Sequence, residues 1–325
     1  MLLIALYTFI FRTVCKNCGG RSLFGKGLDV GIWKMGGGSS TPVTVEKKTE
    51  LLGKPWRNVV WDHSTQTDLK QYLLDYKPTI DSVPQARILL IGRIQAGKSS
   101  FFNSINSIFR GNITSQAGAG EMTTSLTLKY RTYKVKAGRG GQPLAFLLCD
   151  TMGLEQTDHG GVNPKDIMSI LKGYIPDEYQ FNPSQPKEAS DCQQCSTQTL
   201  ADRIHCVVYV MDSSSPGLLD EGMKKKVDEI RKECCLHDVP LLVLLTKVDR
   251  ACPRVEEDLE NVYRSCYIRE LIKKASGCLG IAESNVLPVK NYSSEIELND
   301  TCDILLLSAM KQMLNFADNY LDNFD

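Results

Sequence analysis

Apolar runs alternate with amphipathic stretches from residue 86 to the end of the chain. Residues 204–211 and 241–245 are apolar without interruption, which is typical of strands buried on both faces of a parallel sheet. Between them, apolar residues recur on one helical face over 219–234. Further strands are predicted at 87–91, 126–135, 144–149 and 286–289, and further helices at 99–109 and 300–320.

Strands that alternate with helices predict a three-layer α/β domain over residues 86–322, with a mostly parallel sheet and helices on both faces. A glycine-rich turn joins the second and third predicted strands, so one strand of the sheet is expected to be an antiparallel hairpin strand. Residues 61–85 form a short helical lead-in, in which Thr67 is expected to cap a helix that Pro78 stops.

Residues 1–60 are rich in Gly, Ser, Lys and Thr without periodicity, which predicts a flexible, partly disordered segment. Met35 begins the string M-G-G-G-S-S, which matches the pattern for N-terminal myristoylation. That modification requires a terminal glycine, so membrane attachment through Gly36 is expected only if translation starts at Met35. Otherwise the string is a glycine-rich linker.

The composition excludes several classes of protein. A hydrophobic content of 42% supplies a real core and excludes whole-chain disorder. Lys and Arg number 38, as do Asp and Glu, so no nucleic-acid partner is expected. The 12 cysteines are scattered, and several lie inside apolar runs, which favours reduced, buried thiols in a cytoplasmic protein.

A phosphate-binding loop is predicted between the first strand and the first helix, because residues 92–99 read GRIQAGKS and match GxxxxGKS in the required context. Backbone N–H groups of such a loop converge on phosphates at a helix N-terminus. Lys98 is expected to reach the β- and γ-phosphates. The candidate phosphate-binding residues are Gly92, Gln95, Ala96, Gly97, Lys98, Ser99, Ser100 and Gly153.

A magnesium site is predicted beside this loop. Asp150 ends the third strand and begins the string D-T-M-G, so its carboxylate and the Ser99 hydroxyl are candidate ligands. Thr123 or Thr124 is the candidate switch threonine that closes over the ion, and Thr124 is preferred. The predicted metal set is Ser99, Thr124 and Asp150.

A guanine-binding segment is predicted at the end of the fifth strand, where residues 246–249 read TKVD. The Asp249 carboxylate can accept hydrogen bonds from guanine N1–H and N2–H₂, which adenine does not offer. The Lys247 stem is expected to lie against the base. Thr246 stands where many GTP-binding proteins have Asn, and Asn291 is expected to cover the base from the next loop.

No catalytic group is assigned. Small GTPases carry a water-orienting Gln immediately after D-x-x-G, and this chain has Leu154 there. Gln156 and His159 follow in a segment of turn composition, and Arg93 and Gln95 of the phosphate-binding loop are candidates for contacts to the phosphates on dimerisation. Slow hydrolysis by the isolated protein is therefore expected.

The motifs together resemble the interferon-induced protein 44 family. The similarity covers about residues 70–318 and lies in the strings RILLIG and AGKSSFFNS, CDTMGL, DRIHCV, LLTKVD, and VKNYS with DILLLSA. The resemblance implies a P-loop GTPase domain in a cytoplasmic GTP-binding protein that is induced in innate, antiviral immunity. Family members carry an N-terminal TLDc domain, for which residues 1–60 are expected to be too short and too polar.

Three hypotheses about function follow. The first is a magnesium-dependent GTP/GDP switch that acts on unidentified protein partners, with slow or partner-dependent hydrolysis. The second is a GTPase enzyme activated by self-association into a nucleotide-dependent homodimer. The third is a nucleotide-stabilised scaffold without turnover, which the intact Lys98, Ser99, Asp150 and Asp249 disfavour.

Overall fold

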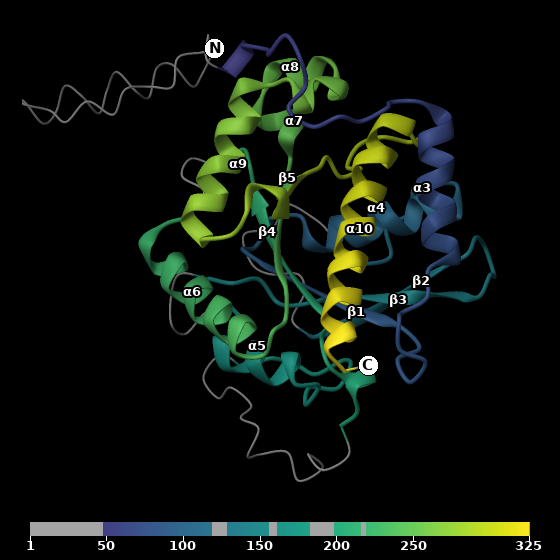
Figure 1. The fold of residues 1–325 in the computed structure, drawn as a ribbon, viewed down its shortest axis with the longest axis vertical. Coiled ribbons are helices and arrows are strands. Elements are labelled where there is room, and N and C mark those ends of the chain that lie inside the picture. Colours follow the sequence, from purple (N-terminus) through teal and green to yellow (C-terminus); the bar gives the residue numbers. More distant parts are fainter. Residues whose placement is uncertain (1–47, 119–128, 156–160, 183–197, 216–218, 325) are drawn as a thin grey trace, which may run out of the picture. The chain divides into compact units, whose positions relative to one another are not determined.

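The computed structural model describes residues 48–118, 129–155, 161–182, 198–215 and 219–324. Contacts divide the chain into residues 1–42 and 43–325, and all described residues belong to the second unit. Its centre is a six-stranded sheet in the order β2-β3-β1-β4-β5-β6 (Figure 1). The strands are β1 Ala86–Gly92, β2 Arg131–Lys136, β3 Pro143–Asp150, β4 Cys206–Asp212, β5 Leu241–Thr246 and β6 Val286–Pro288.

The direction and the burial of the strands agree with the sequence pattern. The pairs β1–β3, β1–β4, β4–β5 and β5–β6 are parallel, whereas β2 runs antiparallel to β3. Strand β5 is buried along its whole length, as its uninterrupted apolar run predicts. Strand β2 lies at the edge of the sheet and is mostly polar. Val135 is its one fully buried residue. The predicted mostly parallel sheet with one antiparallel hairpin strand is confirmed.

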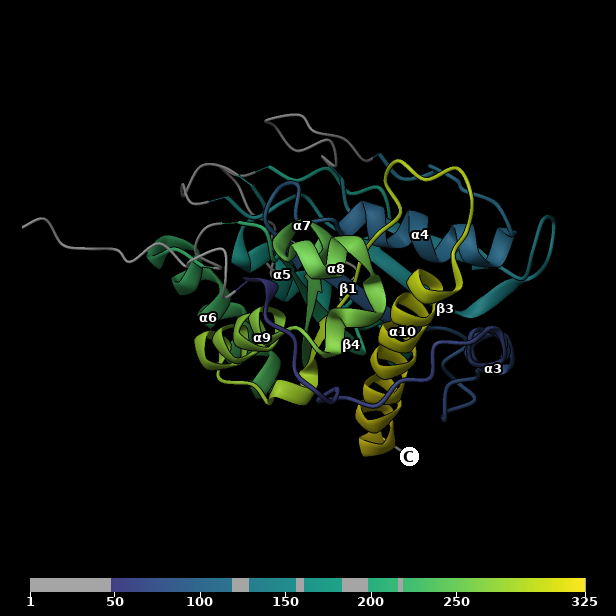
Figure 2. The same cartoon turned by 90° about the horizontal axis from the view of Figure 1, so that it is seen from above.

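Helices cover both faces of the sheet. Helices α4 and α10 lie on one face with α3 packed outside α10, and α5, α6 and α9 lie on the other (Figures 1 and 2). The helices are α3 His63–Asp75, α4 Lys98–Arg110, α5 Pro164–Leu171, α6 Glu221–Leu236, α7 Val248–Ala251, α8 Pro253–Glu257, α9 Cys266–Leu279 and α10 Asp300–Leu321. Short 3₁₀ turns occur at η3 Leu200–Asp202, η4 Leu259–Tyr263, η5 Glu283–Asn285 and η6 Asp322–Phe324. None of the helices in these described stretches is both long enough and apolar enough to cross a membrane.

The N-terminal lead-in differs from its prediction in two respects. Asp62, not Thr67, caps α3 by accepting the Thr65 N–H over 2.8 Å, because Asp62 is the residue with extended backbone at the helix entrance. Residues 48–60, for which a flexible segment is predicted, are packed against the domain. Leu52 N–H donates to Arg264 O at 2.7 Å, and the Trp56 ring meets Tyr263 edge-on at 5.0 Å. Residues 1–47, including Met35 and Gly36, lie outside the described residues.

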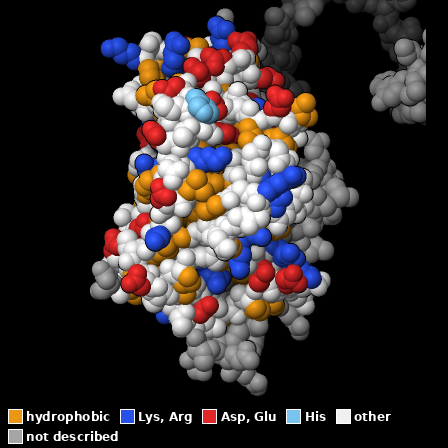
Figure 3. All heavy atoms as spheres, turned by 90° about the vertical axis from the view of Figure 1, so that its right-hand side faces the viewer, with side chains coloured by type: hydrophobic (Ala, Val, Ile, Leu, Met, Phe, Trp, Pro, Cys, Tyr) orange, Lys and Arg blue, Asp and Glu red, His pale blue; other side chains and the backbone are white. Residues whose placement is uncertain are grey.

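The face on which α3 and α10 lie carries charges of both signs (Figure 3). Acidic and basic side chains alternate there, and apolar side chains are divided into small patches between them. The apolar sides of these helices therefore face inward, where Leu73 of α3 and Leu305 and Met313 of α10 are buried.

Candidate functional site

The loop between β1 and α4 is shaped by two glycines. Gly92 has a φ of 150°, and a Cβ there would collide with the backbone oxygen of Val210 in β4. Gly97 has a φ of 100° at the N-cap of α4, and a Cβ would lie 2.9 Å from Nδ2 of Asn291. Only glycine fits both positions. The loop is thus pressed against β4 and Asn291 while the N-terminus of α4 opens towards it, which is the arrangement that binds phosphate.

Lys98 lies inside this loop. Its Nζ donates to the carbonyl oxygens of Gly92 and Arg93, both at 3.0 Å, and its side chain is 7% exposed. Burial lowers the pKa of Lys98, and the nearby charge of Asp150 partly opposes that effect. A buried ammonium held mainly by carbonyl oxygens attracts an anion strongly, because a phosphate would compensate its desolvation.

Ser99 and Asp150 meet beside Lys98. The Ser99 hydroxyl donates to Oδ2 of Asp150 at 2.6 Å, and Asp150 is completely buried at the end of β3. A hydroxyl oxygen and a carboxylate oxygen thus lie together beside the phosphate-binding loop, and oxygen atoms are the ligands that Mg²⁺ prefers. Gly153 lies against the loop as well, since a Cβ there would come within 2.6 Å of the Ile94 side chain.

Leu154, which stands where small GTPases have Gln, is a packing residue. Its side chain is 1% exposed, and its N–H donates to Gly92 O at 2.9 Å. Leu154 also forms two isolated β-bridges, a parallel one with Arg93 and an antiparallel one with Gly161. The chain after Asp150 thus runs alongside the phosphate-binding loop, and the buried aliphatic side chain of Leu154 is in no position to orient water. Gln156 and His159 lie outside the described residues.

The end of β5 is tied directly to the phosphate-binding loop. Thr246 is completely buried, and its hydroxyl lies 2.6 Å from Ala96 O and 3.1 Å from Met211 O. The hydroxyl therefore connects the segment predicted to bind guanine to the phosphate-binding loop across β4. The sequence does not indicate this structural role for Thr246.

Lys247 forms a close ion pair with Asp212, the last residue of β4. Its Nζ lies 2.6 Å from Oδ2 of Asp212, and its backbone is left-handed with a φ of 58°. Burial would raise the pKa of Asp212, but hydrogen bonds from Lys247 and Ser214 hold it below the usual range. Asp249 follows in the first turn of α7 and is partly exposed. Its negative charge is one of the causes that raise the pKa of Lys290.

Asn291 reaches the phosphate-binding loop from the segment that joins β6 to α10. Its Nδ2 donates to Gly97 O at 3.1 Å, while its Oδ1 is buried with no hydrogen-bond partner among the described atoms. A buried acceptor without a donor is costly. The Asn291 side chain is therefore suited to a ligand that brings an N–H or O–H group to this position.

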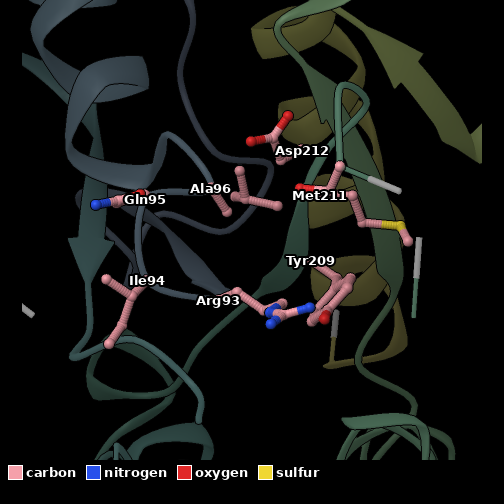
Figure 4. A pocket seen from close by; sticks show the side chains of 9 residues that line it. Arg93, Ile94, Gln95, Ala96, Tyr209, Met211 and Asp212 are labelled. Carbon is pink, nitrogen blue, oxygen red and sulfur yellow. The ribbon is translucent and has the colours of Figure 1, made fainter. Parts of the chain in front are cut away.

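A pocket of about 330 Å³ opens between the phosphate-binding loop and the end of β4 (Figure 4). Arg93 points across it towards Tyr209, whereas Gln95 points away to the other side of the loop. Arg93 also pairs with Asp220, the N-cap of α6, at 3.3 Å. The lining residues are Arg93, Ile94, Gln95, Ala96, Tyr209, Val210, Met211, Asp212 and Ser215.

The structure thus brings most of the predicted site residues to the carboxyl edge of the sheet, around the β1–α4 loop. Ser100 lies beside Ser99 in the first turn of α4, and its carbonyl accepts the Ser104 hydroxyl at 2.8 Å. Thr123 and Thr124 lie outside the described residues, so the switch threonine stays a prediction. Asp212 is the main omission from the sequence-based set, although an Asp that ends a buried strand is the same signal that identifies Asp150.

Comparison with known protein families supports a GTPase domain around this site. Residues 87–247 match the family model described as 50S ribosome-binding GTPase. The matched region begins in β1 and ends at Lys247, so it contains the phosphate-binding loop and the Asp150 segment. It shows that this part of the chain is a GTPase domain, as predicted.

Two curated relatives extend the similarity beyond that region. Human interferon-induced protein 44-like is 44% identical over 249 residues, which are 77% of this chain and 55% of that protein. Mouse interferon-induced protein 44 is 39% identical over 257 residues, which are 79% of this chain and 60% of that protein. The chain thus spans between 55% and 60% of the length of these relatives.

Among solved structures, a variant of Era from Aquifex aeolicus bound to GDP.AlF4⁻ aligns with 72% of this chain and 57% of its own. The identity is 13% and the TM-score is 0.36, a likeness too distant to support a conclusion about this chain.

Proposed function

This chain belongs to the interferon-induced protein 44 family, and we propose that its GTPase domain is a magnesium-dependent GTP/GDP switch with slow intrinsic hydrolysis. The observation that carries the proposal is the link between the two halves of the site. Thr246 and Asn291 both bond to carbonyl oxygens of the phosphate-binding loop, at Ala96 and Gly97. One ligand is therefore able to contact that loop and the guanine-binding segment together.

In this proposal the phosphates lie on the β1–α4 loop. The buried Lys98 ammonium exchanges carbonyl contacts for phosphate oxygens, and the backbone N–H groups at the start of α4 complete the cradle. Each charge-assisted hydrogen bond contributes about 1.5–3 kcal/mol. Phosphate binding thus supplies most of the affinity and is the same for any purine nucleotide.

Guanine selection then falls to the segment after β5. Asp249 accepts from guanine N1–H and N2–H₂, while the Asp212 carboxylate fixes the Lys247 stem beneath the base. Adenine offers no donors to pair with a carboxylate there, so ADP would leave Asp249 unpaired against the base. The buried Oδ1 of Asn291 is a further acceptor, on a side chain that donates to Gly97 O of the phosphate-binding loop.

Ser99 and Asp150 are the residues that would hold Mg²⁺, with Thr124 as the proposed third ligand. The ion would neutralise phosphate charge and support phosphoryl transfer to water. The Ser99 hydroxyl would exchange its hydrogen bond to Asp150 for metal ligation. Magnesium and GDP are therefore expected to bind cooperatively.

Slow turnover is the expected consequence of Leu154. The side chain that would orient the attacking water is replaced by a buried aliphatic group, so hydrolysis depends on a group from elsewhere. Gln95 is exposed on the phosphate-binding loop with a left-handed φ of 62°, and it is the described residue best suited to act on self-association. Measuring specific GTPase activity over a hundredfold range of protein concentration separates the two cases: a constant value supports the switch, and a steep rise supports self-activation.

The names of the relatives describe those proteins as interferon-induced, and we infer that this chain is induced by interferon as well. A role in innate antiviral defence through protein partners is proposed from the resemblance of its motifs to that family. The cytoplasm is proposed from the scattered cysteines, several of which lie inside apolar runs. Transcript measurement in interferon-treated cells of the source organism tests the first part. An unchanged transcript would contradict it.

Titration calorimetry with GDP and ADP tests the nucleotide assignment. GDP with Mg²⁺ is expected to bind at least about 100-fold more tightly than ADP, which corresponds to the two hydrogen bonds that only guanine offers. Chelating Mg²⁺ with EDTA is expected to weaken GDP binding. Equal affinities for GDP and ADP would refute guanine selection, and no binding of either would refute the nucleotide switch.

A further inference from the structure

The segment of residues 289–299, which joins β6 to α10 and carries Asn291, is held by a buried polar network. Tyr292 is the centre of this network. Its backbone N–H donates to Ser104 Oγ in α4 at 3.0 Å, and its hydroxyl lies 2.6 Å from Oδ1 of Asp303. The same hydroxyl accepts the N–H of Asn299 at 2.8 Å, which closes residues 292–299 into a ring.

The network continues into α3. Gln66 Nε2 donates to the second carboxylate oxygen of Asp303 at 3.0 Å. Gln66, Asp303 and Tyr292 are 7%, 1% and 8% exposed, so water has little access to these contacts. Helices α3 and α10 lie side by side in both views of the ribbon (Figures 1 and 2).

All three residues lie outside residues 87–247, the region that the GTPase family model matches. The network is therefore an addition to the part of the domain that this family model describes. It ends on the residue next to Asn291, whose side chain bonds to the phosphate-binding loop at Gly97 O.

A buried carboxylate is a costly way to stabilise a helix pair. Burial raises the pKa of Asp303, while Tyr292 and Gln66 oppose that rise by hydrogen bonding. Well-packed apolar side chains at such positions are often as stable or more stable, whereas a fully satisfied polar network fixes one geometry. The geometry fixed here is that of the segment carrying Asn291.

We propose that Gln66 and Asp303 are positioning residues of the guanine-nucleotide site, and that α3 acts through them and Tyr292 to slow the release of bound nucleotide. This inference rests on the proposed function. In the intact network, Tyr292 keeps the 289–299 segment closed and Asn291 seated against Gly97. Loss of a contact frees the segment, so the base leaves more readily while the phosphate cradle is unchanged.

The test uses dissociation of fluorescent mant-GDP from the full chain, after mant-GDP binding by the wild-type protein has been measured. Gln66→Leu and Tyr292→Phe each remove one hydrogen-bonding group and keep the side-chain bulk. We expect either change to raise the dissociation rate roughly five- to twentyfold, as for the loss of one buried hydrogen bond. Because both act through one chain of contacts, the double variant is expected to be no faster than about twice the faster single variant.

Tyr76→Phe is the matched control. Tyr76 is the C-cap of α3, and its hydroxyl donates to Asp318 Oδ1 of α10 at 2.7 Å. This change therefore also removes a hydrogen bond between the end of α3 and α10, but at a position remote from the 289–299 segment. Its dissociation rate is expected to stay within about twofold of wild type. Pyrophosphate, which has no base, is expected to bind all variants with unchanged affinity.

Three results would overturn the inference: unchanged release from folded Gln66→Leu and Tyr292→Phe proteins, equally faster release from Tyr76→Phe, or a parallel loss of pyrophosphate affinity. The last two would indicate general loosening of the domain. If one of the two test variants does not fold, as judged by thermal melting, the other carries the test. Failure of wild-type protein to bind mant-GDP would refute the proposed function itself and is seen before any variant is made.

Discussion

Thr246 donates its hydroxyl hydrogen to the carbonyl oxygen of Ala96 across 2.6 Å, which joins the end of β5 to the phosphate-binding loop. The two residues are 150 positions apart in the chain. In a parallel sheet the carboxyl ends of β1, β4 and β5 meet at one edge, and this hydrogen bond joins the phosphate-binding loop there to the segment proposed to bind guanine.

Removing the Thr246 hydroxyl tests that link. Thr246→Val keeps the shape and leaves Ala96 O without its buried donor, which is expected to lower the free energy of unfolding by about 1–2 kcal/mol. GDP affinity is expected to fall about tenfold, because the loop is less well fixed. Thr246→Ser, which retains the hydroxyl, should recover most of both losses. GDP titration and urea unfolding check the result, and wild-type GDP affinity in Thr246→Val would contradict it.

Lys98→Met separates stability from binding. The substitution removes a buried ammonium whose pKa is lowered by burial, so the nucleotide-free protein is expected to melt at the wild-type temperature or higher. Affinity for GDP and for pyrophosphate is expected to fall about 100-fold or more, because charge-assisted hydrogen bonds to phosphate are lost. Melting curves with and without GDP measure both effects. A large drop in the nucleotide-free melting temperature would mean that Lys98 is structural.

Restoring glutamine after D-x-x-G is expected to fail. Leu154 is buried and held by its backbone to Gly92, so Leu154→Gln puts an amide into the core instead of over the phosphates. A loss of about 1–3 kcal/mol in unfolding free energy is expected, with no gain in GTP hydrolysis. Single-turnover hydrolysis and urea unfolding test this. A tenfold faster reaction would show that the segment rearranges when GTP binds.

A buried histidine predicts the acid sensitivity of the fold. His205 is completely buried, with Nδ1 accepting the Arg87 N–H at 3.0 Å and Nε2 lying 2.9 Å from Leu200 O. Burial lowers its pKa to about 4, below the ordinary value of about 6.5. Between these values the unfolded chain binds the proton more strongly than the folded chain, so stability falls as the pH falls.

The expected loss from His205 is about 2 kcal/mol between pH 7.5 and pH 5. Urea unfolding at the two pH values measures it. His205→Gln should lose about that much less than wild type over the same interval. Equal pH dependence in wild type and His205→Gln would contradict the assignment.

Local signals account for what the sequence predicts correctly. The phosphate-binding loop is recognisable because Gly92, Gly97 and Lys98 lie at fixed spacing between an apolar strand and a helix. The uninterrupted apolar runs identify β4 and β5 because both strands are buried. Such features depend only on residues that are close together in the chain, so they can be predicted before the fold is known.

Features that depend on distant neighbours are not predicted. Gln66 and Asp303 are 237 positions apart, and nothing near either residue indicates their hydrogen bond. The cap of α3 falls at Asp62 because the chain enters the helix there, although Thr67 has an equally suitable side chain. Helix α9 is absent from the predicted elements even though Ile268, Ile272 and Leu279 recur at helical spacing, so its signal was available in the sequence.

The base specificity of Asp249→Asn tests the central claim most directly. If a carboxylate at this position selects guanine, the amide should pair with xanthine, which offers an acceptor where guanine has its N2 amino group. Titration of wild type and variant with GDP and XDP is expected to show a reversed preference, with GDP weakened and XDP strengthened by about 100-fold each. An unchanged preference for GDP in Asp249→Asn would contradict the account.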